Sequence, residues 1–143
     1  MSYIPPTTRQ QVRQRAANRC EYCKSHQDYV MGQFQIDHVL PVVRDGSDDS
    51  DNLCLACELC NQYKWTKIDE VDPLSGQRVP LFNPRRQKWS DHFSWSEDGV
   101  EITGLSPVGR ATVIALSLNN ELAVTVRKNW IQAGWHPSQT TSD

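Results

Sequence analysis

Two Cys-x-x-Cys pairs constrain this chain more than any other feature of its sequence. Cys20 and Cys23 form the first pair, Cys57 and Cys60 form the second, and 33 residues separate them. Two thiolates with this spacing can reach one ion at about 2.3 Å, and four of them complete a tetrahedron with no open position. Because sulfur ligands favour zinc over magnesium or calcium, the pattern predicts one structural zinc ion.

A zinc ion at this place would join the two ends of the segment between the pairs. The first 70 residues are poor in large aliphatic side chains, and structural zinc can supply on the order of 10 kcal/mol of folding free energy. Buried or redox-active thiols are the alternative, but neither pair follows a strand of a βαβ pattern, as a thioredoxin-like motif does. His26 is a weaker candidate ligand, and Cys54 is expected to be a buried, small apolar residue.

Local patterns predict the elements that carry the first pair and the residues after it. Thr8 and Gln11 match a capping box and predict a helix over residues 9–18. Polar and apolar residues alternate over residues 33–39, which predicts a strand. Pro41 ends that strand because proline cannot donate to a ladder.

The second pair follows a predicted loop and strand. Residues 44–51 are rich in glycine and aspartate and form the loop, and a short apolar run over 53–56 fits a second strand. Residues 58–68 then predict a helix. The segment from the first Cys-x-x-Cys pair therefore runs through a strand, a loop and a second strand to the second pair and a helix. This order indicates an α+β fold.

The chain is expected to divide into three parts. Residues 1–68 form the domain that carries the cysteines, and residues 69–88, with three prolines and a glycine, form an irregular connection. Residues 89–143 are expected to form a hairpin around Asp98-Gly99 followed by helices. One helix begins at Pro107, and a second begins after Asn119 or Asn120 and ends near Gly134.

Composition limits the classes of partner. The net charge is -2 and the isoelectric point is about 6.1, so the chain does not bind nucleic acid by bulk charge. Local basic groups decide where phosphates bind, and these lie near the N-terminus, after the second cysteine pair and near residue 86. No apolar run approaches 18 residues, and the N-terminus lacks the apolar stretch of a signal peptide. We therefore expect a cytoplasmic protein without a membrane span.

A set of polar residues between and beside the cysteine pairs predicts a second centre. Asp37 and His38 lie at the end of the first predicted strand, and Asn61 and Lys64 share one face of the following helix. If that helix packs across the strands, oxygens of Asp37 and Asn61 can converge on one ion. Carboxylate and amide oxygens suit Mg²⁺ or Mn²⁺.

This set matches the needs of phosphodiester hydrolysis. His38 has a side chain suited to accepting a proton near neutral pH, and a divalent metal ion can polarise the phosphate. Lys64 can contact a flanking phosphate, and the Asn52 amide can hold the loop or the His38 ring by hydrogen bonds. Adjacent strand residues point to opposite faces, so Asp37 and His38 share a face only if the ladder breaks there.

The stretch resembles an HNH nuclease domain of the ββα-metal class. The match covers about residues 9–67, and it rests on these motifs: Cys20-Glu-Tyr-Cys23, Asp37-His38-Val39-Leu40-Pro41, Gly46, Asn52-Leu53 and Cys57-Glu-Leu-Cys60-Asn61-Gln-Tyr-Lys64. Residues 81–137 are also similar to the C-terminal extension of small stand-alone bacterial HNH proteins. Asn61 stands where the family name has histidine, a replacement found in many members.

The resemblance implies a metal-dependent endonuclease that cleaves DNA, and possibly RNA. It implies His38 as the general base, Asp37 and Asn61 as ligands of one Mg²⁺ or Mn²⁺ ion, Asn52 as the residue that orients the base, and the four cysteines as zinc ligands. We also expect phosphate contacts from basic side chains: Lys64, Lys67, Arg85 and Arg86. The alternative is a non-catalytic zinc module that binds nucleic acid or protein. The oligomeric state is left open.

Overall fold

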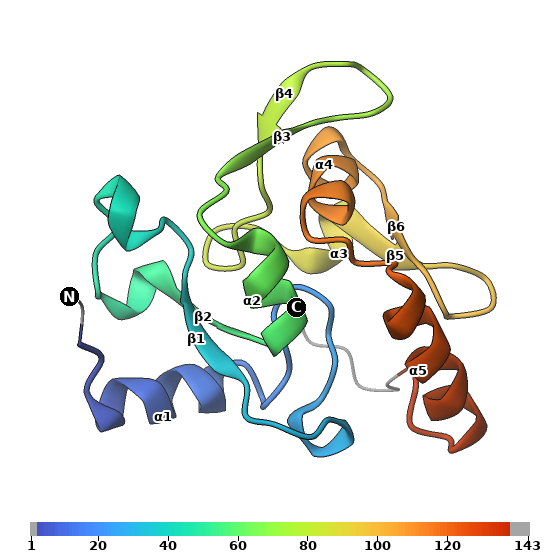
Figure 1. Ribbon diagram of the computed structural model, residues 1–143, viewed down its shortest axis with the longest axis horizontal. Coiled ribbons are helices and arrows are strands. Elements are labelled where there is room, and N and C mark those ends of the chain that lie inside the picture. Colours follow the sequence, from blue (N-terminus) through green and yellow to red (C-terminus); the bar gives the residue numbers. More distant parts are fainter. Residues whose placement is uncertain (1–2, 138–143) are drawn as a thin grey trace. The chain divides into compact units, whose positions relative to one another are not determined.

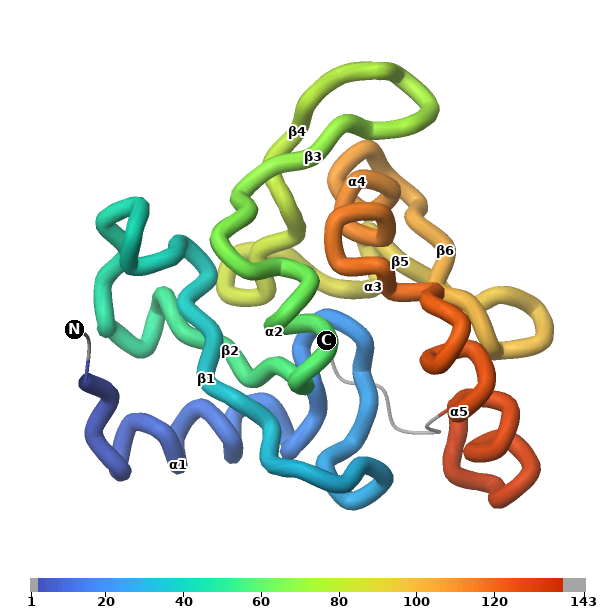
Figure 2. Tube along the Cα trace, in the orientation of Figure 1, coloured from blue at the N-terminus to red at the C-terminus, as the bar shows by residue number. Residues whose placement is uncertain are grey.

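The computed structural model describes residues 3–137 and divides into two compact units. The first unit spans Met1–Ile68 and Asn83–Gln87, and the second spans Asp69–Phe82 and Lys88–Asp143. Figure 1 labels the elements of each unit, and Figure 2 follows the same chain as a tube. The helices and short antiparallel strand pairs confirm the α+β class.

The first unit has the predicted order of helix, strand, strand and helix. Its elements are α1 (Pro6–Arg15), β1 (Gln35–His38), β2 (Leu53–Ala56) and α2 (Glu58–Lys64). Helix α1 packs against β2, and α2 packs against β1 (Figure 1). Three 3₁₀ turns lie in the connections: η1 (Gln27–Tyr29), η2 (Val42–Arg44) and η3 (Ser50–Asn52).

The start of α1 differs from the prediction. The helix begins at Pro6 with Pro5 as its N-cap, so Thr8 lies inside the first turn and the predicted capping box is wrong. Proline at the first helical position has its φ already set for the helix, and its missing N–H would have no partner there in any case. Val12 is fully buried and anchors the helix to the unit.

Strands β1 and β2 form the antiparallel pair at the centre of the first unit. Asp37 is opposite Cys54, and His38 is opposite Leu53. All four residues of β2 are buried, whereas β1 is buried only at Asp37. Because side chains alternate along a strand, Asp37 and Cys54 share one face, and His38 and Leu53 share the other.

Within the described residues, the second unit contains two hairpins and three helices. Strands β3 (Asp69–Val71) and β4 (Arg78–Pro80) pair, as do β5 (Phe93–Trp95) and β6 (Ile102–Gly104). The helices are α3 (Trp89–His92), α4 (Pro107–Ala115) and α5 (Glu121–Gln132). Asn120 caps α5, and Gly134 has a left-handed φ beyond its end, as its sequence position predicts.

The segment over residues 69–88 has more structure than the irregular connection expected from its prolines. Strands β3 and β4 lie within it, and Asp72 at the end of β3 is completely buried. The Asp72 carboxylate accepts hydrogen bonds from the Arg110 guanidinium at 2.8 and 3.0 Å and from the backbone N–H groups of Leu74 and Ser75. Arg110 is 38 residues from Asp72 in the sequence. Because this distant contact holds the end of the hairpin, local sequence patterns do not reveal the hairpin.

Candidate active site and metal centre

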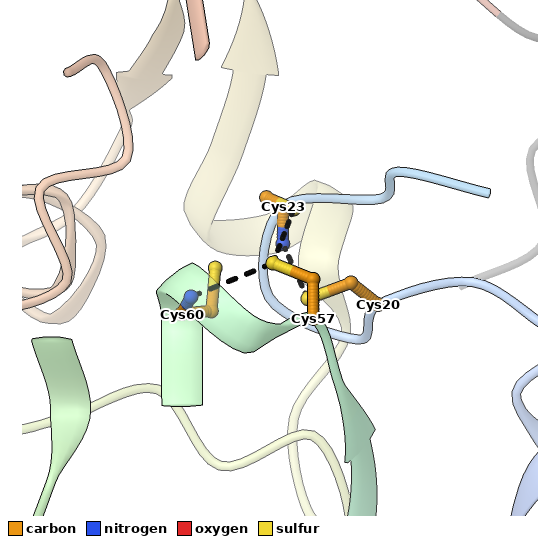
Figure 3. Close-up of side chains that lie close together, drawn as sticks. All are labelled: Cys20, Cys23, Cys57 and Cys60. Carbon is orange, nitrogen blue, oxygen red and sulfur yellow. Dashed lines mark hydrogen bonds between the residues drawn. The ribbon is translucent and has the colours of Figure 1, made fainter. Parts of the chain in front are cut away.

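The four paired cysteines meet at one point. Cys20 and Cys23 lie in the loop after α1, Cys57 and Cys60 lie at the start of α2, and their side chains face one another (Figure 3). The four sulfur atoms lie within 4.8 Å of one another, and those of Cys23 and Cys57 are 3.7 Å apart. A tetrahedral zinc ion with bonds of about 2.3 Å would place its sulfur ligands about 3.8 Å apart. The group can therefore hold a metal ion such as zinc.

The two pairs have the same local geometry. In each pair the second cysteine donates its backbone N–H to the sulfur of the first at 3.4 Å, from Cys23 to Cys20 and from Cys60 to Cys57. Burial raises the pKa of Cys20, while hydrogen bonds among the thiols raise the pKa of Cys60 and lower that of Cys23. The hydrogen bonds thus favour the thiolate form of Cys23 over those of Cys20 and Cys60, and a bound divalent cation would favour the thiolate form of each ligand.

The carboxylate of Asp37 is buried and is held by residues from the segments that carry the clustered cysteines. Its Oδ2 atom accepts a hydrogen bond from the Tyr22 hydroxyl at 2.9 Å and lies 3.1 Å from the Lys64 ammonium. Tyr22 lies between Cys20 and Cys23, and Lys64 lies on α2, the helix that begins at the second cysteine pair. Burial, followed by the electrostatic influence of the neighbouring Cys54 and Asp37 side chains, raises the pKa of Tyr22 well above its usual value, so its hydroxyl remains a donor. The same elements therefore support Asp37 and the thiols.

Asn61 and Asp37 face the same interface between α2 and β1. Asn61 Nδ2 donates to Gln35 Oε1, and Lys64 Nζ contacts Asp37. Gln35 and Asp37 are two residues apart and share one face of β1, just as Asn61 and Lys64 share one face of α2. Helix α2 therefore packs on β1 as predicted, with Gln35 as the direct partner of Asn61 and Lys64 as the direct partner of Asp37. Within residues 3–137 the four cysteines are the only group of three or more His, Cys, Asp or Glu side chains whose ligand atoms lie close enough together to hold one metal ion.

His38 projects from the opposite face of β1. The ladder does not break at this position, because His38 still pairs with Leu53 and the Val39 N–H donates to the Asn52 carbonyl at 2.8 Å. The His38 side chain is 16% exposed, and its Nε2 atom lies 2.8 Å from Asp48 Oδ1. The ring is thus held by a carboxylate from the loop between the strands.

The Asn52 side chain holds that loop by hydrogen bonds to backbone atoms of the loop. Its Nδ2 donates to the carbonyls of Leu40 at 3.0 Å and Ser47 at 2.8 Å, and its Oδ1 accepts from the Leu40 N–H at 2.9 Å. Of the two roles open to Asn52, these contacts serve the loop rather than the ring of His38. Gly46 allows the loop to close, because a Cβ atom there would lie 1.7 Å from the Leu40 carbonyl oxygen.

The basic residues expected at phosphates divide into two groups. Lys64 is 1% exposed and donates to the His38 carbonyl at 3.0 Å, so its charge lies inside the unit with Asp37. Arg85 forms an ion pair with Glu21, and burial followed by the charge of Arg15 lowers its pKa to about 10. This pair attaches residues 83–87 to the first unit. Lys67 and Arg86 are exposed.

Three residues of the site were not predicted from the sequence. Tyr22 lies inside the first cysteine pair, and Gln35 is two residues before Asp37, so spacing would have placed both near the centre. Asp48 is different, because nothing local distinguishes it from the other acidic residues of its loop. Only the folded loop selects one of the four: Asp45, Asp48, Asp49 and Asp51.

Comparison with known families agrees with the resemblance seen in the sequence. Residues 20–67 match the family model described as HNH endonuclease, which confirms the resemblance for this part of the chain. The matched range contains both cysteine pairs, Asp37, His38, Asn52 and Asn61. Comparisons with curated proteins and with solved structures found no match. In the part of the chain that the structure describes, every helix is too short or too polar to span a membrane.

Proposed function

We propose that the first unit is a metal-dependent endonuclease that hydrolyses phosphodiester bonds in DNA, with His38 as the general base. Members of the HNH family act on nucleic acid, mostly DNA. The observation that carries the proposal is the placement of Asp37 and His38 at one strand end, each held by a charged partner, with Asn61 on the adjoining helix. A structural zinc ion at the four cysteines completes the proposed site.

The proposed reaction is an in-line displacement at phosphorus. His38 accepts a proton from a water molecule, and the resulting hydroxide forms a new bond to phosphorus. The bond from phosphorus to the 3′ oxygen breaks on the opposite side, and that oxygen takes a proton from solvent. Groups must therefore act on two sides of the phosphate. Asp37 and His38 lie on opposite faces of β1 at its end, and the proposal assigns one of them to each side of the phosphate.

The donor chemistry around Asp37 fits a hard cation. Asp37 and Asn61 would hold Mg²⁺ or Mn²⁺ through a carboxylate and an amide oxygen. Such an ion, when bound, polarises the scissile phosphate and neutralises the leaving oxygen. Lys64 balances the charge of Asp37 in this structure. The Lys64 ammonium would have to move away from Asp37 Oδ2 before that oxygen could serve as a metal ligand. The Asn61 contact with Gln35 uses Nδ2, so Oδ1 is the atom that would serve as the ligand.

Phosphate contacts in this proposal fall to exposed basic residues. Lys67 follows α2, and Arg86 lies on the segment that Arg85 attaches to the first unit. Lys64 and Arg85 have roles inside the protein instead. They contribute by holding Asp37 and the 83–87 segment in place.

The rival proposal is a zinc module that binds nucleic acid or protein without cleaving it. One observation favours it, namely that the Asp37 carboxylate already has a cationic partner in Lys64. The His38 contact with Asp48 favours the enzyme, because a binding module has no need of an oriented imidazole.

A plasmid-nicking assay separates the two proposals. The wild-type protein is incubated with supercoiled DNA and Mg²⁺ or Mn²⁺, beside His38→Ala and the control His26→Ala, which removes a histidine from a different part of the unit. We expect metal-dependent nicking that His38→Ala abolishes and His26→Ala retains, at equal zinc content. DNA binding without nicking by the wild type would favour the rival.

A further inference from the structure

The contact between His38 and Asp48 joins a candidate base to a loop carboxylate. His38 Nε2 lies 2.8 Å from Asp48 Oδ1, and the side chains are 16% and 40% exposed. The two residues are ten positions apart, so this contact forms only when the loop folds back on β1. A partly shielded hydrogen bond to a carboxylate fixes both the plane of an imidazole ring and the nitrogen that carries its proton.

The loop is built so that Asp48 reaches the ring. Asn52 Nδ2 donates to the carbonyl of Ser47, the residue before Asp48, and to that of Leu40, two residues after His38. The Gly46 N–H donates to the Pro41 carbonyl at 3.0 Å, and Gly46 leaves the space that the loop needs. These contacts tie both ends of the loop together, which places the Asp48 carboxylate beside His38.

We propose that Asp48 is a positioning residue that orients His38 for proton transfer. Asp48 accepts a hydrogen bond from Nε2–H, which leaves the lone pair on Nδ1 to accept the proton of water. The new N–H bond forms at Nδ1, the O–H bond of water breaks, and the ring becomes a cation beside the Asp48 carboxylate. This inference rests on the proposed nuclease function and adds a named residue to its site.

The kinetic test compares Asp48→Ala with two other variants of the full chain. Asp48→Glu keeps a carboxylate that can still reach Nε2, and Asp49→Ala removes the same charge one residue further along the loop. We expect Asp48→Ala to lower kcat about 10- to 100-fold with little change in KM, as for other partners that orient a functional histidine. Asp48→Glu should recover part of that loss, and Asp49→Ala should behave as the wild type.

A second measurement does not depend on activity. The ¹⁵N chemical shifts of the His38 ring report which nitrogen carries the proton, and the difference between wild type and His38→Ala identifies its signals. We expect the Nε2–H form in the wild type and in Asp49→Ala, and a mixture of the two neutral forms in Asp48→Ala. Zinc content and circular dichroism establish that each variant is folded.

Three results would overturn the inference. Equal losses of kcat in Asp48→Ala and Asp49→Ala would mean that the loop acts only through its charge. An unchanged Nε2–H form in Asp48→Ala would mean that Asp48 does not select the proton position. A wild-type protein that binds metal but does not nick DNA would overturn the proposed function as well, whereas the first two results leave that function standing.

Discussion

The ammonium of Lys64 lies 3.1 Å from Asp37 Oδ2, and both side chains are almost completely shielded from solvent. This ion pair connects the end of α2 to β1 at the centre of the candidate site. Removing one partner of a buried pair leaves an uncompensated charge, which costs far more than breaking a pair at the surface. Lys64 therefore contributes first to the stability of the site.

Replacement of this lysine is the first prediction. We expect Lys64→Met to lower the free energy of unfolding by about 3–5 kcal/mol, because Asp37 remains buried without its counter-charge. The matched control is Lys67→Met on the exposed side, which should leave stability within about 0.5 kcal/mol and weaken DNA binding at low salt. Denaturant unfolding measures both variants. Equal stability losses would contradict the buried ion pair.

The second prediction concerns the metal content of the cysteine centre. We expect one zinc ion per chain in the wild type, none in Cys57→Ser, and a large loss of thermal stability in that variant, because structural zinc supplies on the order of 10 kcal/mol. Cys54→Ala is the control, since Cys54 is a buried thiol outside the cluster. Native mass spectrometry counts the ions. Full zinc content in Cys57→Ser would rule out the four-thiol site.

The hydroxyl of Tyr22 provides the third prediction. Tyr22→Phe keeps the buried ring but removes the hydrogen bond to Asp37. Because that bond serves a buried carboxylate, we expect a loss of about 1–3 kcal/mol in the free energy of unfolding. Zinc content should not change, because no thiol is altered. A variant as stable as the wild type would show that the Tyr22 hydroxyl does not help to hold Asp37.

The fourth prediction tests the close approach at Gly46. Gly46→Ala would place a methyl group 1.7 Å from the Leu40 carbonyl oxygen, so the loop must move. We expect a loss of about 1–3 kcal/mol in stability and reduced nicking, because Asp48 is displaced from His38. Gly76→Ala is the comparison, since its added carbon meets nothing within 4 Å and the cost comes only from its left-handed φ. If Gly46→Ala retained full activity, the loop would not position His38.

The buried Asp72 gives the second unit a predictable response to acid. The Arg110 guanidinium holds the pKa of Asp72 well below its usual range. A carboxyl whose pKa is lowered by folding stabilises the protein above its unfolded pKa of about 3.9, and that contribution is lost as the pH falls through the folded value. We expect Asp72→Asn to reduce the dependence of stability on pH below about pH 4. Acid titration followed by circular dichroism checks this, and identical acid profiles would contradict it.

Spacing and periodicity in the sequence were enough to predict the cysteine centre and the elements beside it. Four thiols in two Cys-x-x-Cys pairs can satisfy one tetrahedral ion almost regardless of the rest of the fold. The alternation in residues 33–39 and the apolar run in 53–56 predicted β1 and β2, because side-chain direction in a strand follows a period of two. Asp37, His38, Asn52 and Asn61 were singled out by residue type and position, and their functional roles stay predictions.

The partners of those residues were decided only by the tertiary structure. Lys64 and Lys67 are identical in chemistry and three residues apart, yet one charge is buried and the other is exposed. Of four acidic residues in one loop, only Asp48 contacts His38. Arg85 lies in the segment that was expected to be an irregular connection, yet it forms an ion pair with Glu21. Hydrogen bonds and burial join residues that are distant along the chain, so neither composition nor local periodicity determines which charged groups meet.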